Sequence, residues 1–189
     1  MNEEDLLYLN SQPDGNTVLR TESLEIRELV RKNASSVLRI LAECPEGSFM
    51  LPDVALPGPA SDEQEFEAAA SGLGVIIASD ITDQYRFFGY GLWGVFHDGQ
   101  IIGLAMLKNG SASNVCEIGY AILSEYRRKK FMTEAMLAVL EHARSCGFHT
   151  AGINITGDNP VSLAFWNNLK KEYNRRHCYN DVDSFNLTL

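Results

Sequence analysis

The segment 115–145 constrains the fold of this chain more than any other part of the sequence. It reads as an apolar strand, then four consecutive basic residues at 127–130, then an amphipathic helix. The first backbone N–H groups of a helix have no intrahelical partners, and the helix dipole places positive charge at the same end. A strand that enters a helix through a basic bend therefore predicts a binding site for an anion such as phosphate.

Length and composition predict a single domain over residues 1–189. The chain is 45% hydrophobic and 22% charged, a balance that is typical of a packed protein and not of a disordered one. Its formal net charge of −9 argues against a nucleic-acid partner. The basic run at 127–130 is an exception to this acidic background.

We expect a cytoplasmic protein that neither associates with a membrane nor binds a metal. The chain opens without the basic segment of a secretory signal, and no apolar run approaches the roughly 18 residues of a spanning helix. The histidines and cysteines show no zinc-type spacing, which favours reduced thiols over metal ligands. The four cysteines are Cys44, Cys116, Cys146 and Cys178.

The first half of the chain predicts a polar lead-in, one strand and two helices. The lead-in covers 1–20, and an edge strand follows at 23–29. We expect Asn33 to cap the first helix and Ser61 the second, because each precedes apolar residues at helical spacing. Proline and glycine are frequent in 44–60, which is predicted to be a loop.

The second half alternates strands and helices. A hairpin is predicted around Asp98 and Gly99, because Asp-Gly tolerates the positive φ angles of a type I′ turn. The helix after the basic run should end near Gly147, a strand should follow at 151–156, and after a further helix the tail at 176–189 could add one or two strands. Four aromatic residues are predicted to lie in the core: Phe87, Phe88, Trp93 and Phe96.

This order of elements predicts the fold class. A meander of strands followed by alternating helices and strands indicates an α/β (α+β) fold. We expect a mixed, mostly antiparallel central sheet with helices on both faces.

Glu117 is a carboxylate inside the strand at 115–123 and is the candidate general base. Both faces of this strand are mostly apolar, which predicts a central place in the sheet. Gly119 and Ala121 lie on the same face as Glu117 and leave space beside its carboxylate, whose pKa burial could raise. The structural alternative is a glutamate at the edge of the strand that is solvated or paired with a base.

The basic run at 127–130 also has a structural alternative, a solvated loop without a ligand. Its position between a strand and a helix favours anion binding over this alternative. Neither GxxxxGK[ST] nor GxGxxG occurs in the chain, so neither nucleotide-binding loop is supported.

The stretch EIGYAILSEYRRKKFMTEAMLAVLEHA, a following strand and DNPVSLAFWNNL resemble the GNAT acetyltransferase superfamily. The resemblance extends over roughly residues 18–170 and is greatest to the branch that includes the ribosomal-protein N-terminal acetyltransferases. LRTESLEIREL and GLWGVFHDGQIIGLAML are similar in style to the same branch. The resemblance implies acetyl-CoA as cosubstrate and an amine as acceptor.

The family's acyl-CoA loop, Gln/Arg-x-x-Gly-x-Gly/Ala, falls on residues 127–132. The chain departs from this pattern at Lys130, in the glycine position, and at Met132, in the small-residue position. Glycine lets a diphosphate approach the backbone closely, so the Lys130 side chain weakens the expectation of tight binding. Its amide N–H is retained, however, and its ammonium group can add a phosphate contact. The implied diphosphate-binding residues are Arg127, Arg128, Lys129, Lys130, Phe131 and Met132.

The resemblance implies further cofactor contacts. Ile122, Leu123 and Ser124 should pair with the pantetheine arm and aim an N–H at the thioester oxygen, where a bulge would splay the strand from its neighbour. Asn159 should contact the cofactor, with a helix N-cap as its structural alternative. Trp166 stands where many relatives carry a tyrosine near the leaving thiolate, so no general acid is assigned.

The leading hypothesis is an N-acetyltransferase that moves acetyl directly to a primary amine in a ternary complex, with Glu117 removing a proton directly or through water. The main alternative is a GNAT-like protein that binds acyl-CoA as a sensor or interaction partner with little or no turnover, and a third is a structural domain. The acceptor stays open between a protein N-terminus, a polyamine and a small molecule, which the 44–60 loop would help to bind. A homodimer is also compatible with the resemblance.

Overall fold

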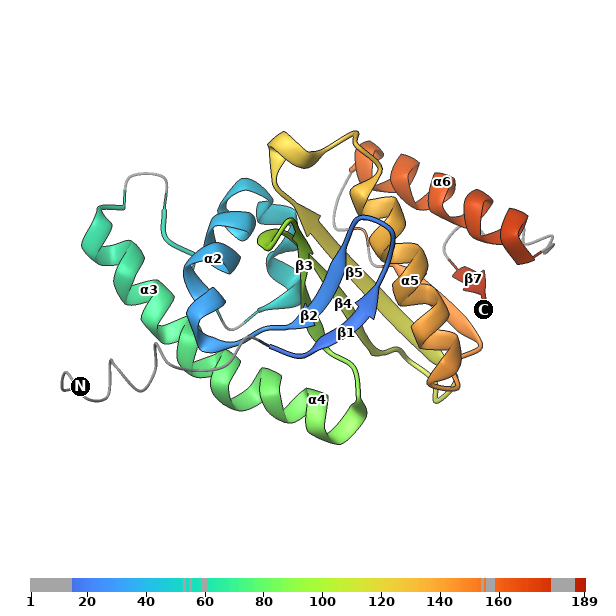
Figure 1. Cartoon of the computed structure of the whole chain (residues 1–189), viewed down its shortest axis with the longest axis horizontal. Coiled ribbons are helices and arrows are strands. Elements are labelled where there is room, and N and C mark those ends of the chain that lie inside the picture. The colour runs from blue at the N-terminus through green and yellow to red at the C-terminus, as the bar shows by residue number, and fades with distance from the viewer. Residues whose placement is uncertain are drawn as a thin grey trace.

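The computed structural model describes residues 15–52, 54, 56–58, 61–153, 155, 159–177 and 186–189. These residues form a seven-stranded sheet in which the strands lie side by side in chain order (Figure 1). Neighbouring strands are antiparallel, except that β5 and β6 are parallel. The strands are β1 (Thr17–Arg20), β2 (Glu25–Glu28), β3 (Leu92–His97), β4 (Gln100–Asn109), β5 (Val115–Ile122), β6 (Thr150–Ile153) and β7 (Asn186–Thr188).

Helices cover both faces of this mixed sheet, so the predicted fold class is confirmed (Figure 1). The α-helices are α2 (Ala34–Glu43), α3 (Glu63–Ile76), α4 (Thr82–Phe88), α5 (Phe131–Ser145) and α6 (Pro160–His177). Short 3₁₀ helices are η1 (Arg31–Asn33), η2 (Pro45–Met50) and η4 (Ser124–Tyr126), and a π-helical turn, η3 (Ile77–Ile81), joins α3 to α4.

The two faces of β5 show how the layers are arranged. Gly119 lies under η2, because a Cβ at this position would be 2.9 Å from Cζ of Phe49. Tyr120, the next residue, packs its ring against Phe165 of α6, with 4.4 Å between ring centroids. Successive side chains of a strand point to opposite faces, so η2 and α6 lie on opposite sides of the sheet.

The amphipathic pattern of the helix after the basic run is confirmed in α5. Met132, Met136, Val139 and Ala143 follow one another at three- and four-residue spacing and are all buried. The predicted hairpin is also confirmed. Asp98 and Gly99 have φ angles of 49° and 78° between β3 and β4, as a type I′ turn requires.

The sheet opens between β5 and β6, and this opening positions the site. The parallel pairing begins at Val115 with Thr150 and stops at Ile118 with Ile153. Beyond this point the β6 side of β5 has no strand partner among the described residues, while its other side stays paired with β4 as far as Ile122. The β4–β5 register is unbroken, so the expected bulge is wrong and the splay arises where the β5–β6 pairing ends.

Several predicted elements differ in the first half of the chain. Thr17–Arg20, placed in the polar lead-in, forms the edge strand β1. The strand predicted at that edge is β2, which lies inside the sheet between β1 and β3. The loop predicted at 44–60 contains the 3₁₀ helix η2, so it is not wholly irregular.

The predicted helix caps also differ. Asn33 does not cap α2; its side-chain oxygen accepts from the Val30 N–H at 2.9 Å and closes η1 instead. The cap of α3 is Asp62 and not Ser61, because Asp62 Oδ1 accepts from the Glu65 N–H at 2.9 Å.

Two of the four aromatic residues predicted to be core lie at the surface. Trp93 and Phe96 are buried, as expected. Phe87 and Phe88 are 79% and 54% exposed, because α4 carries them past the edge of the sheet before Gly89 ends the helix with a φ of 73°.

No helix among the residues described above combines the length and apolar character needed to cross a bilayer. Cys178 and most of the tail at 176–189 lie outside the described residues, as do two of the six residues of the strand predicted at 151–156. The described end of the tail forms β7, which pairs with β6.

Candidate active site

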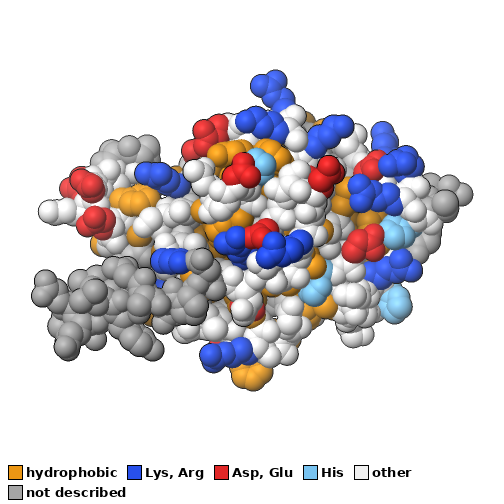
Figure 2. Space-filling model, in the orientation of Figure 1, with side chains coloured by type: hydrophobic (Ala, Val, Ile, Leu, Met, Phe, Trp, Pro, Cys, Tyr) orange, Lys and Arg blue, Asp and Glu red, His pale blue; other side chains and the backbone are white. Residues whose placement is uncertain are grey.

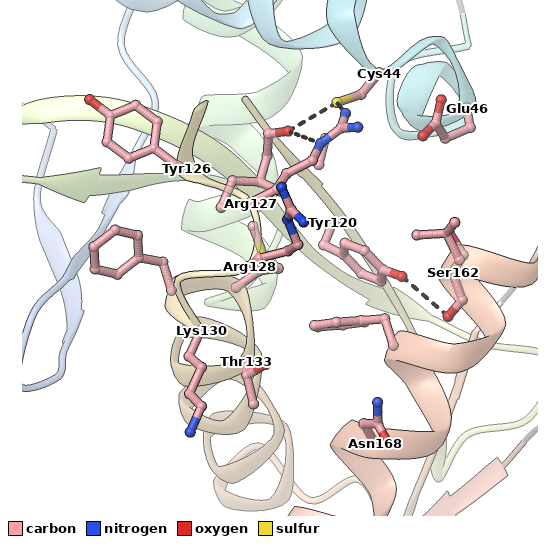
Figure 3. A pocket seen from close by; sticks show the side chains of 16 residues that line it. Cys44, Glu46, Tyr120, Tyr126, Arg127, Arg128, Lys130, Thr133, Ser162 and Asn168 are labelled. Carbon is pink, nitrogen blue, oxygen red and sulfur yellow. Dashed lines mark hydrogen bonds between the residues drawn. The ribbon is translucent and has the colours of Figure 1, made fainter. Parts of the chain in front are cut away.

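A cavity of about 510 Å³ lies where β5 separates from β6 (Figure 3). Its wall is formed by the end of β5, the loop before α5, the first turn of α5, the start of α6 and residues around the start of η2. Elements from both faces of the sheet therefore meet at the unpaired side of β5. An elongated ligand could pass from the basic loop to the opening in the sheet.

The N-terminus of α5 faces this cavity without a side-chain cap. Lys130 is the N-cap residue and makes no side-chain capping hydrogen bond. Phe131, Met132 and Thr133, the first turn of the helix, line the cavity. Backbone N–H groups in a first turn lack intrahelical acceptors, and the dipole of this 15-residue helix adds positive charge. The anion site predicted from the sequence falls at this terminus, and its role stays a prediction.

Arg128 and Lys130 have the backbone conformation that usually belongs to glycine. Their φ angles are 61° and 66°, and both residues line the cavity. A left-handed conformation costs a residue with a Cβ about 1–2 kcal/mol. The loop thus keeps a glycine-type backbone path at Lys130 while it carries basic side chains, which Figure 3 shows at the start of α5. Figure 2 shows Lys and Arg side chains gathered on the corresponding edge of the molecule.

Arg127 connects the basic loop to the end of β5. Its Nε donates to the Ile122 carbonyl at 3.3 Å, and one terminal nitrogen donates to Cys44 Sγ at 3.0 Å. The Cys44 thiol in turn donates to the same carbonyl at 3.2 Å (Figure 3). These contacts hold the loop against α2 and fix one wall of the cavity.

The three residues predicted at the end of β5 differ in their positions. Ile122 lines the cavity, whereas Leu123 and Ser124 do not. The Leu123 N–H donates to the Ile102 carbonyl at 3.0 Å. The Ser124 N–H and hydroxyl donate to Glu43 Oε2 at 3.0 and 2.9 Å, and these bonds hold the pKa of Glu43 below its usual value. Both amides already have protein partners.

Glu117 lies on the face of β5 that η2 covers. It lines neither the large cavity nor the smaller cavity that adjoins it. Its Oε1 is 3.3 Å from Nζ of Lys108, its cross-strand neighbour on β4. This ion pair matches the structural alternative stated for Glu117, although the residue is in a central strand and not at an edge. Glu117 precedes the unpaired part of β5 by two residues, so its role as a base stays a prediction.

A second cavity of about 30 Å³ adjoins the first where the sheet opens. Gly119 and Tyr120 of β5 and Ile153 of β6 contribute to its wall. Asn159 also lines it, and its side-chain oxygen accepts from the Ser162 N–H at 2.9 Å. Asn159 therefore caps α6, and cofactor contact by this residue stays a prediction.

Lys129 lines neither cavity. Its ammonium group lies 5.3 Å from the ring centroid of Tyr126, at the outer side of the loop. The structure thus places six predicted cofactor residues around the large cavity and one at the small cavity. The six are Ile122, Arg127, Arg128, Lys130, Phe131 and Met132.

A family model matches the part of the chain that contains most of the large cavity's wall. The model for the acetyltransferase (GNAT) family matches residues 60–169, more than half of the chain. The chain belongs to the GNAT acetyltransferase family. A search of curated protein sequences finds no match.

Solved structures with the same fold include three acetyltransferases of low sequence identity. RimL, a ribosomal L7/L12 alpha-N-protein acetyltransferase in its apo form, is 15% identical, with a TM-score of 0.55 and 92% of each chain covered. The ribosomal-protein-S5-alanine acetyltransferase from Vibrio fischeri is 15% identical, with a TM-score of 0.57 and 80% of each chain covered. PaiA N-acetyltransferase from Thermoplasma acidophilum, solved with coenzyme A, is 17% identical, with a TM-score of 0.55 and coverage of 88% of this chain and 99% of PaiA.

Tyr120 of this GNAT domain is a site residue that sequence reasoning placed only on an apolar strand face. It lines both cavities, and its hydroxyl lies 3.5 Å from the Ser162 carbonyl oxygen, which it faces as a weak donor (Figure 3). Burial raises the pKa of Tyr120, so the phenol holds its proton at neutral pH. The signal that could have found it is a tyrosine beside Gly119 at the point where the strand becomes unpaired.

Trp166, which stands in the place of the tyrosine common in relatives, is fully buried and lines neither cavity. Its indole N–H has no hydrogen-bond partner within the described part of the chain. The same described part contains no group of three or more His, Cys, Asp or Glu side chains arranged to hold a metal ion.

Proposed function

We propose that this GNAT-family protein transfers acetyl from acetyl-CoA to a primary amine by direct attack in a ternary complex. The observation that carries the proposal is the uncapped, basic N-terminus of α5 beside the unpaired side of β5. The helix N-terminus suits a diphosphate, and the unpaired strand backbone suits an extended chain that contains amides. Together they fit the diphosphate and the adjoining pantetheine arm of coenzyme A.

The cofactor would bind along the large cavity. The amides of Phe131 and Met132, with the basic side chains of 127–130, would hold the diphosphate. Ile122 and the residues before it offer unpaired strand backbone to the pantetheine arm. Leu123 and Ser124 would support this arm by fixing the end of β5 through their bonds to Ile102 and Glu43. Asn159 would contact the thioester end from the start of α6.

Two proton transfers accompany the reaction. The attacking amine must lose a proton, because α-amino groups have a pKa near 8 and lysine side chains near 10.4. We assign this proton to Glu117, reached through water from the unpaired part of β5. The nitrogen loses its second proton as the amide forms, and this proton reaches the leaving thiolate through Tyr120, which gives its own proton to sulfur and takes the one from nitrogen; the Tyr120 side chain lines both cavities. The thioester is already activated, so positioning supplies much of the rate.

The acceptor is an amine that reaches the sheet opening from the side of η2. A protein N-terminus, a polyamine and a small amine all carry the required group. The names of two enzymes with this fold state that they acetylate ribosomal proteins. A protein N-terminus is therefore the first acceptor to test. Cys44, Cys116 and Cys146 are free thiols, which supports a cytoplasmic setting for the reaction.

Binding and turnover separate this proposal from its alternatives. Acetyl-CoA should raise the thermal unfolding temperature, and an amine should then release free thiol at a rate proportional to enzyme. Thermal stabilisation without thiol release would instead indicate an acyl-CoA-binding sensor. No stabilisation by acetyl-CoA would contradict both.

Glu117→Gln tests the proton assignment. This substitution should lower turnover at neutral pH and shift the pH–rate profile to higher pH. Without the carboxylate, only amine that has already lost its proton to solvent can react. Glu67→Gln is a matched control that removes the same charge from an exposed position on α3. A pH–rate profile of Glu117→Gln that coincides with wild type would remove Glu117 from the mechanism.

A further inference from the structure

Glu46, the second residue of η2, lies at the junction of the two cavities. It lines the large cavity together with the basic loop (Figure 3), and it lines the small cavity together with Gly119. Tyr120 and Ser162 are the other described residues that line both. These three residues therefore mark the place where a ligand in the large cavity would reach the opening in the sheet.

Charge is distributed unevenly around these cavities. Arg128 and Lys130 lie beside the start of α5, where they line the large cavity. Among the described residues that line either cavity, Glu46 is the single acidic one. An anion is favoured at one end and a cation at the other. The two charged groups that the proposed reaction brings to the site, the diphosphate of the cofactor and the ammonium group of the acceptor, have the same two charges.

The Glu46 carboxylate is available to a ligand. It makes no hydrogen bond or ion pair with another described residue, and it is exposed. Its negative charge acts on the junction, where it adds to the effect of burial in raising the pKa of Tyr120. Phe49, three residues later in η2, rests on Gly119 and fixes η2 against the sheet. Glu46 is thus a free carboxylate on a positioned element.

We propose that Glu46 binds the ammonium group of the acceptor and selects a cationic amine over a neutral nucleophile. This inference rests on the proposed function, because it assigns the acceptor end of the same site. Glu46 holds the ammonium group beside the thioester, and Glu117 receives its proton through water. Loss of Glu46 should therefore affect the acceptor KM more than kcat.

Steady-state thiol release with two probes, spermidine and the peptide Ala-Ala-Ala-amide, tests this assignment. With the probe that wild type acetylates faster, Glu46→Gln should raise the amine KM about five- to tenfold. The KM for acetyl-CoA should stay within about twofold, because Glu46 also lines the small cavity, to whose wall no described basic residue contributes. Glu46→Asp should recover part of the loss. Glu67→Gln, which removes one exposed charge from α3, should leave both KM values unchanged.

Each outcome separates this inference from the function on which it rests. Wild-type turnover with an unchanged amine KM in Glu46→Gln would overturn the role of Glu46 and leave the acetyltransferase proposal intact. An equal rise in the KM for acetyl-CoA would also overturn it, because Glu46 would then act on the cofactor end. A wild-type protein that releases thiol with neither probe would overturn the proposed function and this inference together.

Discussion

At the scale of single residues, the basic loop places two demands on Lys130, a positive charge and a left-handed backbone conformation. Lys130 carries a positive charge to the start of α5 and yet holds a φ of 66°. Most side chains avoid this conformation, because Cβ then approaches the following carbonyl oxygen. The residue therefore exchanges some stability for charge at the anion site.

Replacing Lys130 with glycine should separate stability from binding. Lys130→Gly should raise the free energy of unfolding by up to about 1 kcal/mol, because glycine adopts the left-handed conformation without strain. It should also weaken acetyl-CoA binding about three- to tenfold, because one phosphate contact is lost. Urea denaturation and isothermal titration measure the two effects.

Lys130→Ala is the matched control, since alanine removes the charge and keeps the Cβ. It should lose the same affinity without the gain in stability. If Lys130→Gly bound acetyl-CoA more tightly than wild type, the lysine side chain would obstruct the diphosphate and the assigned phosphate contact would be wrong.

At the scale of elements, the start of α5 is attached to the first hairpin of the sheet. The Glu134 carboxylate, in the first turn of α5, accepts a hydrogen bond from the Thr21 hydroxyl and another from the Ser23 N–H at 2.8 Å. Burial alone would raise the pKa of Glu134, but these hydrogen bonds outweigh it and hold the pKa below the usual value. The helix that forms the anion site is thereby tied to the turn between β1 and β2.

Glu134→Gln should reduce the free energy of unfolding at pH 7 by about 1 kcal/mol, because a neutral amide accepts these bonds more weakly. The folded-state pKa of Glu134 is depressed, so its contribution is present above the unfolded pKa and is lost as pH falls through the folded pKa. The difference between wild type and Glu134→Gln should therefore shrink when denaturation is repeated near pH 3. A difference that is constant with pH would show that the carboxylate charge is not what stabilises this contact.

At the scale of the whole molecule, the sequence predicts elements that have a strong apolar periodicity better than it predicts elements that lack one. The positions of β3, β4, β5 and α5 follow from apolar spacing and from the Asp98-Gly99 turn, which depend on local chain geometry. The resemblance to the family also rests on local sequence, chiefly in the segments 117–143 and 158–169. β1 was missed because four residues with no buried position show no alternation.

The parts of the site that could not be predicted depend on contacts between distant segments. Glu117 pairs with Lys108 because β4 and β5 are in a register that no local pattern specifies. Glu46 reaches the junction because Phe49 of the same 3₁₀ helix fits over Gly119, 70 positions later in the chain. Proline and glycine in 44–60 indicated a loop, and only the folded chain shows what that loop adjoins.

The core of this sheet also predicts how the whole molecule responds to alkali. Cys116, fully buried in β5, has its pKa raised to about 12 by burial. An unfolded cysteine ionises near pH 8.5, so between that pH and about 12 unfolding releases a proton and stability must fall as pH rises. The free energy of unfolding should drop by up to about 1.4 kcal/mol per pH unit from this group alone. Cys116→Ala will be less stable at pH 8 because it leaves a small cavity, but its stability should fall less steeply between about pH 8.5 and 9.5, where unfolded tyrosines, whose pKa is near 10, are still mostly protonated. Urea denaturation at half-unit pH steps would measure both slopes, and parallel curves for the two proteins would show that the Cys116 thiol does not drive the alkaline loss of stability.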